Sequence, residues 1–272
     1  MGELEGKVAL VTGAGRGIGA AVVRELAHRG AAVALLARGE AEVRRVAAEV
    51  AAGGARVLPL TADVGDAAAL VAAIRQIEAA LGNVDILVNN AGIIGPLGPF
   101  ADCPPEEWAR TIAINLLGAG YAAQLVLPAM QRRGWGRIVN VSSGAGQGTG
   151  IARALPYSVS KAGLDMLTRG LAAEVAETGV AVVGVLPGVV DTAMQGEMRA
   201  APVERFGEAS SRRFWGFYEA GALLDPAVPG RLIAVLCGAA GAGYNGQNLR
   251  VADPFAQELL AAADRSEGAE TG

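Results

Sequence analysis

The amino-acid sequence predicts an α/β fold, a doubly wound parallel β-sheet with helices on both faces. Up to about residue 190, short runs rich in Val, Ile and Leu alternate with longer stretches of helical periodicity. The 272 residues are 52% hydrophobic and 18% charged, which suits strands that helices bury on both sides. No low-complexity linker divides the chain. We therefore expect residues 1–272 to form a single domain.

The first half of the chain contains four expected strands, each followed by a helical stretch. The strands are nearly continuous apolar runs, which is typical of parallel strands joined by right-handed helical crossovers. The expected strands are KVALVT (7–12), AVALLA (32–37), RVLPLT (56–61) and VDILVN (84–89), and the helices lie near 17–29, 40–52, 66–81 and 106–132.

The second half continues the alternation with three more strands. A helix near 156–177 is indicated by Pro156, which fits an early helical position, and by the Ala, Leu, Val and Met residues that follow it. A shorter helix near 228–238 precedes the last strand. The expected strands are GRIVNV (136–141), VAVVGVL (180–186) and GQNLRV (246–251).

Residues 192–227 break this alternation. Long insertions in compact domains are often lids, so we expect a substrate-binding insertion here. The alternative is a plain surface excursion, because polar and charged residues dominate the middle of the segment. The tail after about Ala263 is expected to be frayed or disordered.

Charge and composition exclude several classes of function. The net charge is −4 and Lys and Arg are scattered along the chain, which is unlike a nucleic-acid binder. No apolar stretch of about 18 residues runs without charges or glycines, and the first residues lack the features of a secretory signal, so we expect a cytoplasmic protein without a membrane partner. Cys103 and Cys237 are expected to be incidental thiols. Because His28 is the only histidine, neither a Ser-His-Asp triad nor a histidine metal site is expected.

A glycine-rich turn follows the first expected strand and opens the first expected helix. Glycines permit a tight turn and a close backbone approach, and the helix N-terminus offers free N–H groups to a pyrophosphate. The order strand, turn, helix predicts a dinucleotide site. The turn reads Thr12-Gly13-Ala14-Gly15-Arg16-Gly17-Ile18-Gly19.

The residue after the second strand bears on the choice between NAD and NADP. An acid there would accept a hydrogen bond from the ribose 2′-OH, whereas an arginine can bind a 2′-phosphate. The chain has Arg38 at this place and a second guanidinium at Arg16, which favours NADP(H), with NAD(H) possible. The alternative is that Arg38 is a solvated residue at a helix start, beside Glu40.

Tyr157 and Lys161 lie four residues apart in the helix expected near 156–177. Residues at this spacing are neighbours on one helix face, so the phenol and the ammonium can meet. For an isolated pair, the simpler interpretation is a surface contact that stabilises the helix. Other motifs in the chain favour a catalytic interpretation.

These motifs occur along the chain in a fixed order. They are Thr12-Gly13-x-x-x-Gly17-Ile18-Gly19, Asn89-Asn90-Ala91-Gly92, Asn115, Ser142-Ser143, Tyr157-x-x-x-Lys161 and Pro187-Gly188. Together, from Lys7 to about Val251, they resemble the classical short-chain dehydrogenase/reductase family. The extended branch of that family has a glycine where this chain has Arg16. The resemblance implies a seven-stranded Rossmann-like sheet and a hydride-transfer enzyme that uses no metal.

The resemblance also implies roles for four side chains. Tyr157 would be the general acid or base that exchanges a proton with the substrate oxygen. Lys161 would lower the pKa of the tyrosine and bind the nicotinamide ribose. Ser143 would hydrogen-bond the substrate oxygen, and Asn115 would hold a water molecule that feeds the proton relay.

Contacts with the cofactor are implied at the ends of several strands. Asp63 and Val64 would bind the adenine, and the segment after the sixth strand would touch the nicotinamide amide. The full expected cofactor-binding set is Gly13, Gly15, Arg16, Gly17, Ile18, Gly19, Arg38, Asp63, Val64, Asn90, Ala91, Gly92, Tyr157, Lys161, Pro187, Gly188, Val190 and Thr192.

The function we expect is NADPH-dependent reduction of a carbonyl compound. A bulky hydrophobic ketone is favoured by the aromatic residues of the insertion, and a 3-oxoacyl thioester on a carrier protein by its arginines. Two other hypotheses are a non-catalytic NADP-binding protein and an NAD-dependent dehydrogenase. The family also implies a homo-oligomer, a tetramer or dimer formed through the two long helices. The aromatic residues of the insertion are Trp215, Phe217 and Tyr218, and its arginines are Arg199, Arg205, Arg212 and Arg213.

Overall fold

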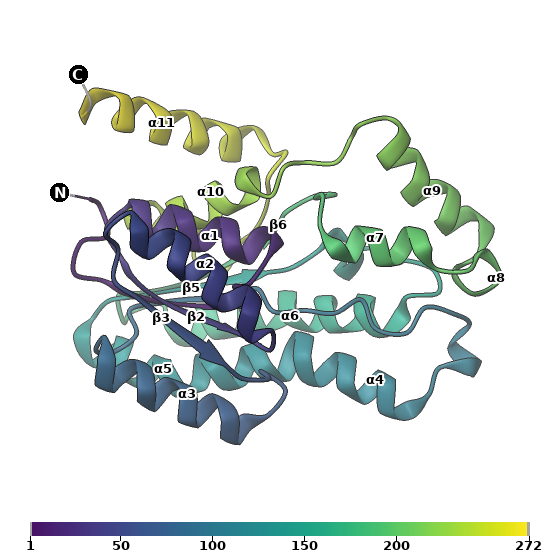
Figure 1. Cartoon of the computed structure of the whole chain (residues 1–272), viewed down its shortest axis with the longest axis horizontal. Helices are drawn as coiled ribbons and strands as arrows, with labels where there is room; N and C mark the ends of the chain where they lie inside the picture. Colours follow the sequence, from purple (N-terminus) through teal and green to yellow (C-terminus); the bar gives the residue numbers. More distant parts are fainter. Residues whose placement is uncertain (1, 271–272) are drawn as a thin grey trace.

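The computed structural model describes residues 2–270 and contains a seven-stranded parallel sheet (Figure 1). The strand order is β3-β2-β1-β4-β5-β6-β7, and every neighbouring pair is parallel. This confirms the predicted fold class. The strands are β1 Val8–Thr12, β2 Ala32–Ala37, β3 Val57–Thr61, β4 Ile86–Asn89, β5 Gly136–Val141, β6 Val180–Leu186 and β7 Asn248–Arg250.

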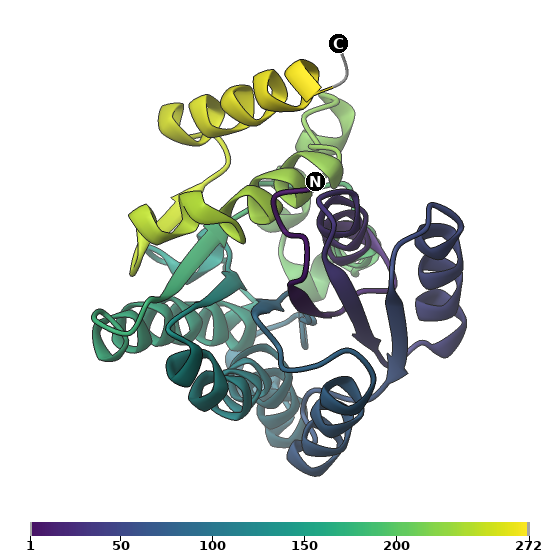
Figure 2. The same cartoon turned by 90° about the vertical axis from the view of Figure 1, so that its left-hand side faces the viewer.

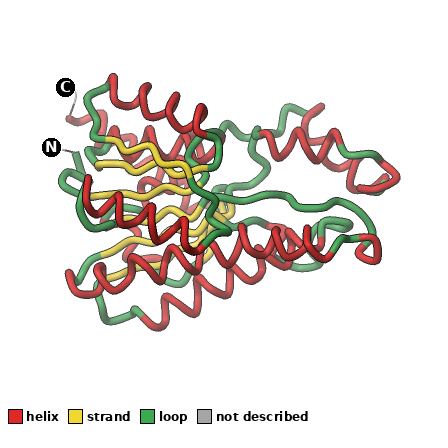
Figure 3. Tube along the Cα trace, turned by 60° about the horizontal axis from the view of Figure 1, so that its bottom comes forward, coloured by secondary structure: helices red, strands yellow, loops and turns green. Residues whose placement is uncertain are grey.

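Helices cover both faces of the sheet, as the apolar strands require (Figures 2 and 3). One buried cluster joins the sheet to α1, α2 and α10, and a second joins its other face to α3, α5 and α6. The fold therefore has three layers. The helices are α1 Gly17–His28, α2 Glu40–Ala52, α10 Ala227–Leu236, α3 Ala67–Ala80, α5 Gly118–Arg133 and α6 Leu155–Glu174.

The helix expected near 106–132 is interrupted by one wide turn. It consists of α4 (Pro105–Ile112), a π-helical turn η2 (Ala113–Leu117) and α5. π-turns of this kind are rare and often mark functional sites. The sequence did not predict it, because the apolar pattern on either side continues without a break.

The same stretch corrects an expectation about membranes. Pro105–Arg133 is long and apolar enough to cross a membrane by composition, with a mean hydropathy of 1.5, although the sequence was expected to contain no such segment. Core helices also pass this criterion. In the fold, α5 packs Ala122, Val126 and Met130 into the core beneath the sheet.

The segment 192–227 forms three short helices that extend beyond the carboxyl ends of the strands (Figures 1 and 3). They are α7 Ala193–Ala200, α8 Val203–Phe206 and α9 Glu208–Glu219. We call α7, α8 and α9 together the lid. The chain just before the lid and the chain just after it meet in an isolated parallel β-bridge between Val190 and Leu224. Asp191 N donates to Leu224 O at 2.9 Å, and Leu224 N donates to Val189 O at 2.8 Å.

The C-terminal segment differs from the expectation. Instead of a frayed tail after Ala263, α11 spans Pro254–Glu270, and residues 271–272 lie outside the described part of the chain. The helix is anchored at its start, where Phe255 stacks on Tyr244 with ring centroids 5.8 Å apart and Ala256 is fully buried. Its apolar residues pack on α10, which the sequence pattern alone did not reveal.

Candidate active site

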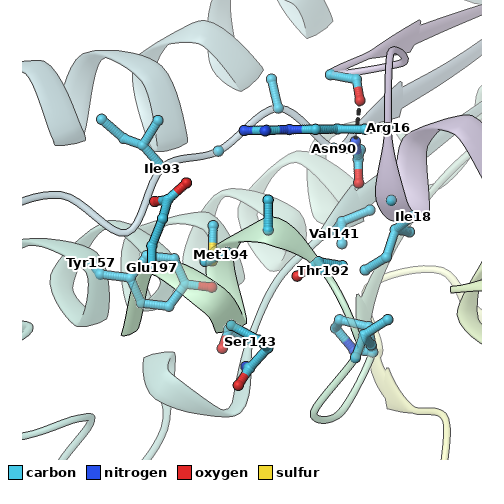
Figure 4. A pocket seen from close by; sticks show the side chains of 18 of the residues that line it. Arg16, Ile18, Asn90, Ile93, Val141, Ser143, Tyr157, Thr192, Met194 and Glu197 are labelled. Carbon is cyan, nitrogen blue, oxygen red and sulfur yellow. Dashed lines mark hydrogen bonds between the residues drawn. The ribbon is translucent and has the colours of Figure 1, made fainter. Parts of the chain in front are cut away.

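A cavity of about 950 Å³ opens at the carboxyl end of the sheet (Figure 4). It lies where the strand order reverses between β1 and β4, the place at which open α/β sheets bind their ligands. The glycine turn lines one part of it, and the lid lines another. In Figure 4, Tyr157 and Ser143 lie on one side, and Arg16, Ile18 and Asn90 on the other.

The glycine turn has the geometry that a pyrophosphate needs. Arg16 precedes α1 with extended backbone, and no side chain caps the first N–H groups of the helix. Gly13 has a φ of 66°, and a Cβ there would lie 2.9 Å from Ala91 Cα. The turn thus leaves no room for larger residues and fits a dinucleotide.

Gly19 was expected to contact the cofactor but is placed behind the turn. It is buried in α1, and a Cβ at this position would lie 2.2 Å from Gly13 O. Its role in the structure is to let the helix pack against the turn, while Gly15, Gly17 and Ile18 line the cavity.

Thr12 and Asn90 fasten the glycine turn to the end of β4. Thr12 Oγ1 accepts hydrogen bonds from the backbone N–H of Asn90 at 3.0 Å and of Ala91 at 3.1 Å. Asn90 Nδ2 donates to Thr12 O and Gly13 O. Asn89 is turned away from the cavity and donates to Asn140 Oδ1 at 2.9 Å, as expected for a structural residue.

The remaining residues expected to bind the cofactor are also placed at the cavity. They come from the ends of β2, β3, β4 and β6 and from the following loops. The lining includes Arg38, Asp63, Val64, Asn90, Ala91, Gly92, Pro187, Gly188, Val190 and Thr192.

The end of the cavity beside α2 contains both positively and negatively charged side chains. The side chain of Arg38 is 54% exposed and approaches Asp63 Oδ2 at 4.0 Å, while Arg110 approaches the same oxygen at 3.3 Å. Glu42, which sequence reasoning missed, also lines the cavity. A Cβ at Gly39 would lie 2.7 Å from Glu42 Oε2, so the carboxylate lies against the turn after β2.

The expected catalytic residues Ser143, Tyr157 and Lys161 come together on the other side. Tyr157 and Lys161 are buried on one face of α6, and Ser143 follows directly after β5. The Ser143 hydroxyl hydrogen-bonds to Tyr157 and accepts from Ala145 N at 3.1 Å. Lys161 Nζ lies 5.8 Å from the centroid of the Tyr157 ring.

Burial controls the ionisation of this pair. It raises the pKa of Tyr157, an effect that the hydrogen bond from Ser143 partly offsets. Burial also lowers the pKa of Lys161 to about 8, against the opposing attraction of Asp165. The net shift of the Tyr157 pKa is opposite to the lowering that we expected from Lys161, because burial of the phenol is the largest influence on it. Lys161 Nζ donates to Val141 O at 2.8 Å.

Asn115 lies behind the cavity in the π-turn. Its Oδ1 accepts from Ile93 N at 2.9 Å, and its Nδ2 donates to Ile93 O at 2.9 Å and to Ser160 Oγ at 3.0 Å. Both amide hydrogens are thus engaged within the protein. The side chain joins the loop after β4 to α6.

The substrate side of the cavity is mainly apolar. Phe214 is buried and Phe217 partly buried, and Phe214 stacks on Phe206 at 5.6 Å between ring centroids. Glu197 from α7 lies on the same side as Tyr157 (Figure 4). The apolar lining comprises Ile93, Ala145, Ile151, Met194, Met198, Phe214 and Phe217.

Two expectations about lid residues need correction. Of the aromatic residues proposed to contact substrate, only Phe217 lines the cavity, because Trp215 and Tyr218 pack edge to face at the exposed surface of α9. The buried Phe214 was missed, although it is one helical turn before Tyr218.

The four arginines of the lid do not form one basic patch. Arg213 lines the cavity, and Arg199 lies over the Tyr218 ring at 4.4 Å. Arg205 Nε donates to Leu97 O at 3.1 Å, and Arg212 forms an ion pair with Glu208 one turn earlier on α9.

Arg153 and Arg205 clamp the lid onto the rest of the molecule. Arg153 Nη1 donates to Glu204 O at 2.6 Å and to Arg205 O at 3.0 Å, while Gly98 N donates to Arg153 O at 2.8 Å. Arg153 holds a φ of 61°, in the left-handed region that favours glycine. Its side-chain contacts stabilise a backbone conformation that is costly for arginine.

The remaining titratable groups give no second reactive centre. Cys103 and Cys237 are free thiols, and burial raises the pKa of Cys237. Among residues 2–270, no cluster of three potential metal ligands is found.

Comparisons with known proteins agree with this geometry. Residues 7–202 match the family described as short chain dehydrogenase. The chain is 40% identical over 194 residues to the oxidoreductase UcpA of Salmonella typhimurium, which covers 71% of this chain and 73% of the relative. It is 39% identical over 209 residues to D-beta-hydroxybutyrate dehydrogenase of Cupriavidus necator, covering 74% of this chain and 80% of the relative.

A solved structure extends the likeness to the fold. A variant of actinorhodin polyketide ketoreductase, solved with NADPH, is similar with a TM-score of 0.82 and 35% identity, over 90% of this chain and 95% of the other. The protein belongs to the classical short-chain dehydrogenase/reductase family and is an NAD(P)-dependent oxidoreductase.

Proposed function

We propose that the protein uses NADPH to reduce an apolar ketone or aldehyde to an alcohol. The observation that carries this proposal is the pairing of Ser143 with Tyr157 at the apolar side of the cavity. A carbonyl oxygen placed between two hydroxyl groups can accept two hydrogen bonds, and the surrounding apolar side chains exclude water from the reacting carbon.

The protonation states support reduction. Because burial raises the pKa of Tyr157, the phenol carries its proton at neutral pH and can act as the general acid. The bound nicotinamide supplies the hydride for the carbonyl carbon. Tyr157 gives its proton to the carbonyl oxygen, and the Lys161 ammonium stabilises the resulting phenolate. We propose that Asn115 supports the proton relay by its main-chain carbonyl, since its side chain is engaged with Ile93 and Ser160.

The cofactor would lie along the cavity from the glycine turn to Lys161. The uncapped start of α1 would bind the pyrophosphate, and Asp63 and Val64 would contact the adenine. Arg16 and Arg38 favour a 2′-phosphate, hence NADPH. The related ketoreductase was solved with the same cofactor.

One observation favours a second candidate, an NAD-dependent dehydrogenase. Glu42 lines the cavity near Arg38, and a carboxylate there would repel a 2′-phosphate. One relative is a D-beta-hydroxybutyrate dehydrogenase, a name that describes alcohol oxidation. A reductase that acts on 3-oxoacyl groups bound to an acidic carrier protein is less favoured. Three of the four lid arginines contact other groups of the lid or the loop at Leu97.

The test measures binding of NADPH and NADH by fluorescence, followed by turnover of the tighter cofactor with a panel of apolar ketones. Tyr157→Phe should keep cofactor affinity and lose at least about 100-fold in kcat, the usual contribution of a general acid. Tight binding without turnover by the unaltered protein for any carbonyl would support the non-catalytic alternative. A preference for NADH would support the dehydrogenase.

A further inference from the structure

A buried carboxylate lies one helical turn beyond the catalytic pair. Tyr157, Lys161 and Asp165 follow each other at intervals of four residues on α6, so their side chains share one face. Asp165 and Lys161 are each only 4% exposed. An acid this deeply buried costs free energy unless it is paired, so its presence needs an explanation.

The contacts of Lys161 and Asp165 hold the end of β5 at two successive residues. Lys161 Nζ donates to Val141 O at 2.8 Å, and the Ser142 hydroxyl donates to Asp165 Oδ1. Ser143, which hydrogen-bonds to Tyr157, is the next residue along the chain. The helix α6, which carries the proposed general acid Tyr157, thus also positions the end of β5 and the serine that follows it.

The turn after Ser143 is attached to the same helix. Burial raises the pKa of Asp165, and the Gln147 side chain is among the groups that oppose this rise. Arg250 from β7 donates to Gln147 Oε1. At Gly146, a Cβ would lie 2.7 Å from the backbone carbon of Lys161, so the turn lies directly on α6. Asp165 therefore accepts a hydrogen bond from the residue before Ser143 and is influenced by Gln147 in the turn after it.

We propose that Asp165 is a positioning residue of the active site, whose carboxylate stabilises the ammonium of Lys161 and, through Ser142 and Gln147, holds Ser143 against Tyr157. The proposal rests on the proposed function for the roles of these groups. It gives a role to the Asp165 carboxylate, which takes no part in the proposed proton and hydride transfers.

Few charged or titratable groups surround Lys161. Tyr157 and Asp165 flank it on α6, Arg169 lies one turn beyond Asp165, and Arg250 approaches from β7 through Gln147. Asp165 is the only acid that acts on Lys161 within the described chain. Removing its charge leaves burial unopposed, so the pKa of Lys161 falls below about 8.

The small number of lysines makes the pKa of Lys161 measurable. Lys7 and Lys161 are the only lysines in the sequence. An NMR titration of protein labelled at lysine Cε and Nζ therefore shows two side-chain signals, and Lys7, whose Nζ lies 3.9 Å from the centre of the Trp135 ring, serves as an internal reference. In Asp165→Asn the Lys161 midpoint should fall by about one unit or more, as for loss of a nearby opposite charge.

The matched control is Glu174→Gln, which removes the same charge from an exposed position on α6. It should leave the Lys161 midpoint unchanged. An equal shift in the two variants, or no shift in Asp165→Asn, overturns the proposal. The titration needs no substrate, so it decides the role of Asp165 even if the unaltered protein reduces no carbonyl and the proposed function fails.

Ser142→Ala tests the second half of the proposal and serves if Asp165→Asn does not fold. It keeps the charge and deletes the bond to the strand end, so kcat should fall about tenfold or more, with KM for the ketone nearly unchanged. Burial raises the pKa of Asp165 and the bond from Ser142 opposes this rise, so its loss leaves Asp165 less ionised and the Lys161 midpoint should shift down slightly. Unaltered kcat and an unaltered midpoint would contradict the proposal.

Discussion

If Tyr157 acts as proposed, we predict that the charge of Lys161 sets the pH range in which it can do so. Burial lowers the pKa of Lys161 to about 8 and raises that of Tyr157, so on raising the pH the ammonium loses its proton first. We predict that kcat/KM for carbonyl reduction, which reports the free enzyme, is level below pH 8 and falls above it. Initial rates between pH 6 and 10 check this. A profile that stays level to pH 10 would show that Lys161 charge is not required.

The charges around Arg38 allow a prediction about cofactor choice. Arg38→Asp should lower the NADPH to NADH preference, and Glu42→Gln should raise it, each by about tenfold for a change of about 1.4 kcal/mol. Binding titrations of both cofactors measure the ratio. Glu40→Gln is a control, because Glu40 forms an ion pair with Arg44 on α2. Opposite or absent shifts at Arg38 would place the 2′-phosphate elsewhere.

At the residue scale, the sequence predicted most of the cavity lining but not the charges behind it. The glycine turn, Ser143 and Tyr157 lie in ordered motifs, and their spacing fixes where they meet. Glu42 and Asp165 stand in no motif. Asp165 repeats the four-residue interval of Tyr157 and Lys161, and this spacing could have indicated that it lies on the same helix face. Its burial could not be predicted, because it depends on packing from β5 and β7.

Among the elements, the lid depends on the clamp at Arg153. Arg153→Gly relieves a left-handed residue, worth about 1 kcal/mol, and deletes two hydrogen bonds worth about 1 kcal/mol each. Global stability should therefore change little, while the lid loosens. We predict faster hydrogen exchange in residues 193–219 and a raised KM for the ketone. Arg212→Ala, which loses only its ion pair with Glu208, should leave both unchanged. Unchanged exchange in Arg153→Gly would mean that Phe206 packing alone holds the lid.

Element prediction succeeded for the apolar strands of the sheet and failed for the segments whose packing partners are distant in the sequence. The six longer strands are nearly continuous apolar runs, and each lies where the sequence places it to within a residue or two. The lid helices are stabilised by Phe206 and Phe214, which meet only in the folded molecule. The same holds for α11, whose partner α10 lies nearby in space.

For the whole molecule, the outer face of α6 suggests how copies associate. Met166 is 61% exposed, and Val159 and Leu155 are exposed on the same helix. We propose that a second copy covers this face, as the family implies. Met166→Glu would place a charge in that contact and should shift the protein toward monomer, as measured by light scattering. Val203→Glu on the lid is the control. A monomeric unaltered protein would contradict the proposal.

The bridge between Val190 and Leu224 has a consequence for how the molecule can diversify. Because the two ends of the segment are already tied together beside β6, the chain between them closes a loop whose entropy depends only weakly on its length. This segment is therefore an exchangeable cassette. We expect that lengthening, shortening or grafting it would alter which substrates are accepted, while the sheet and the glycine turn beneath it keep their structure.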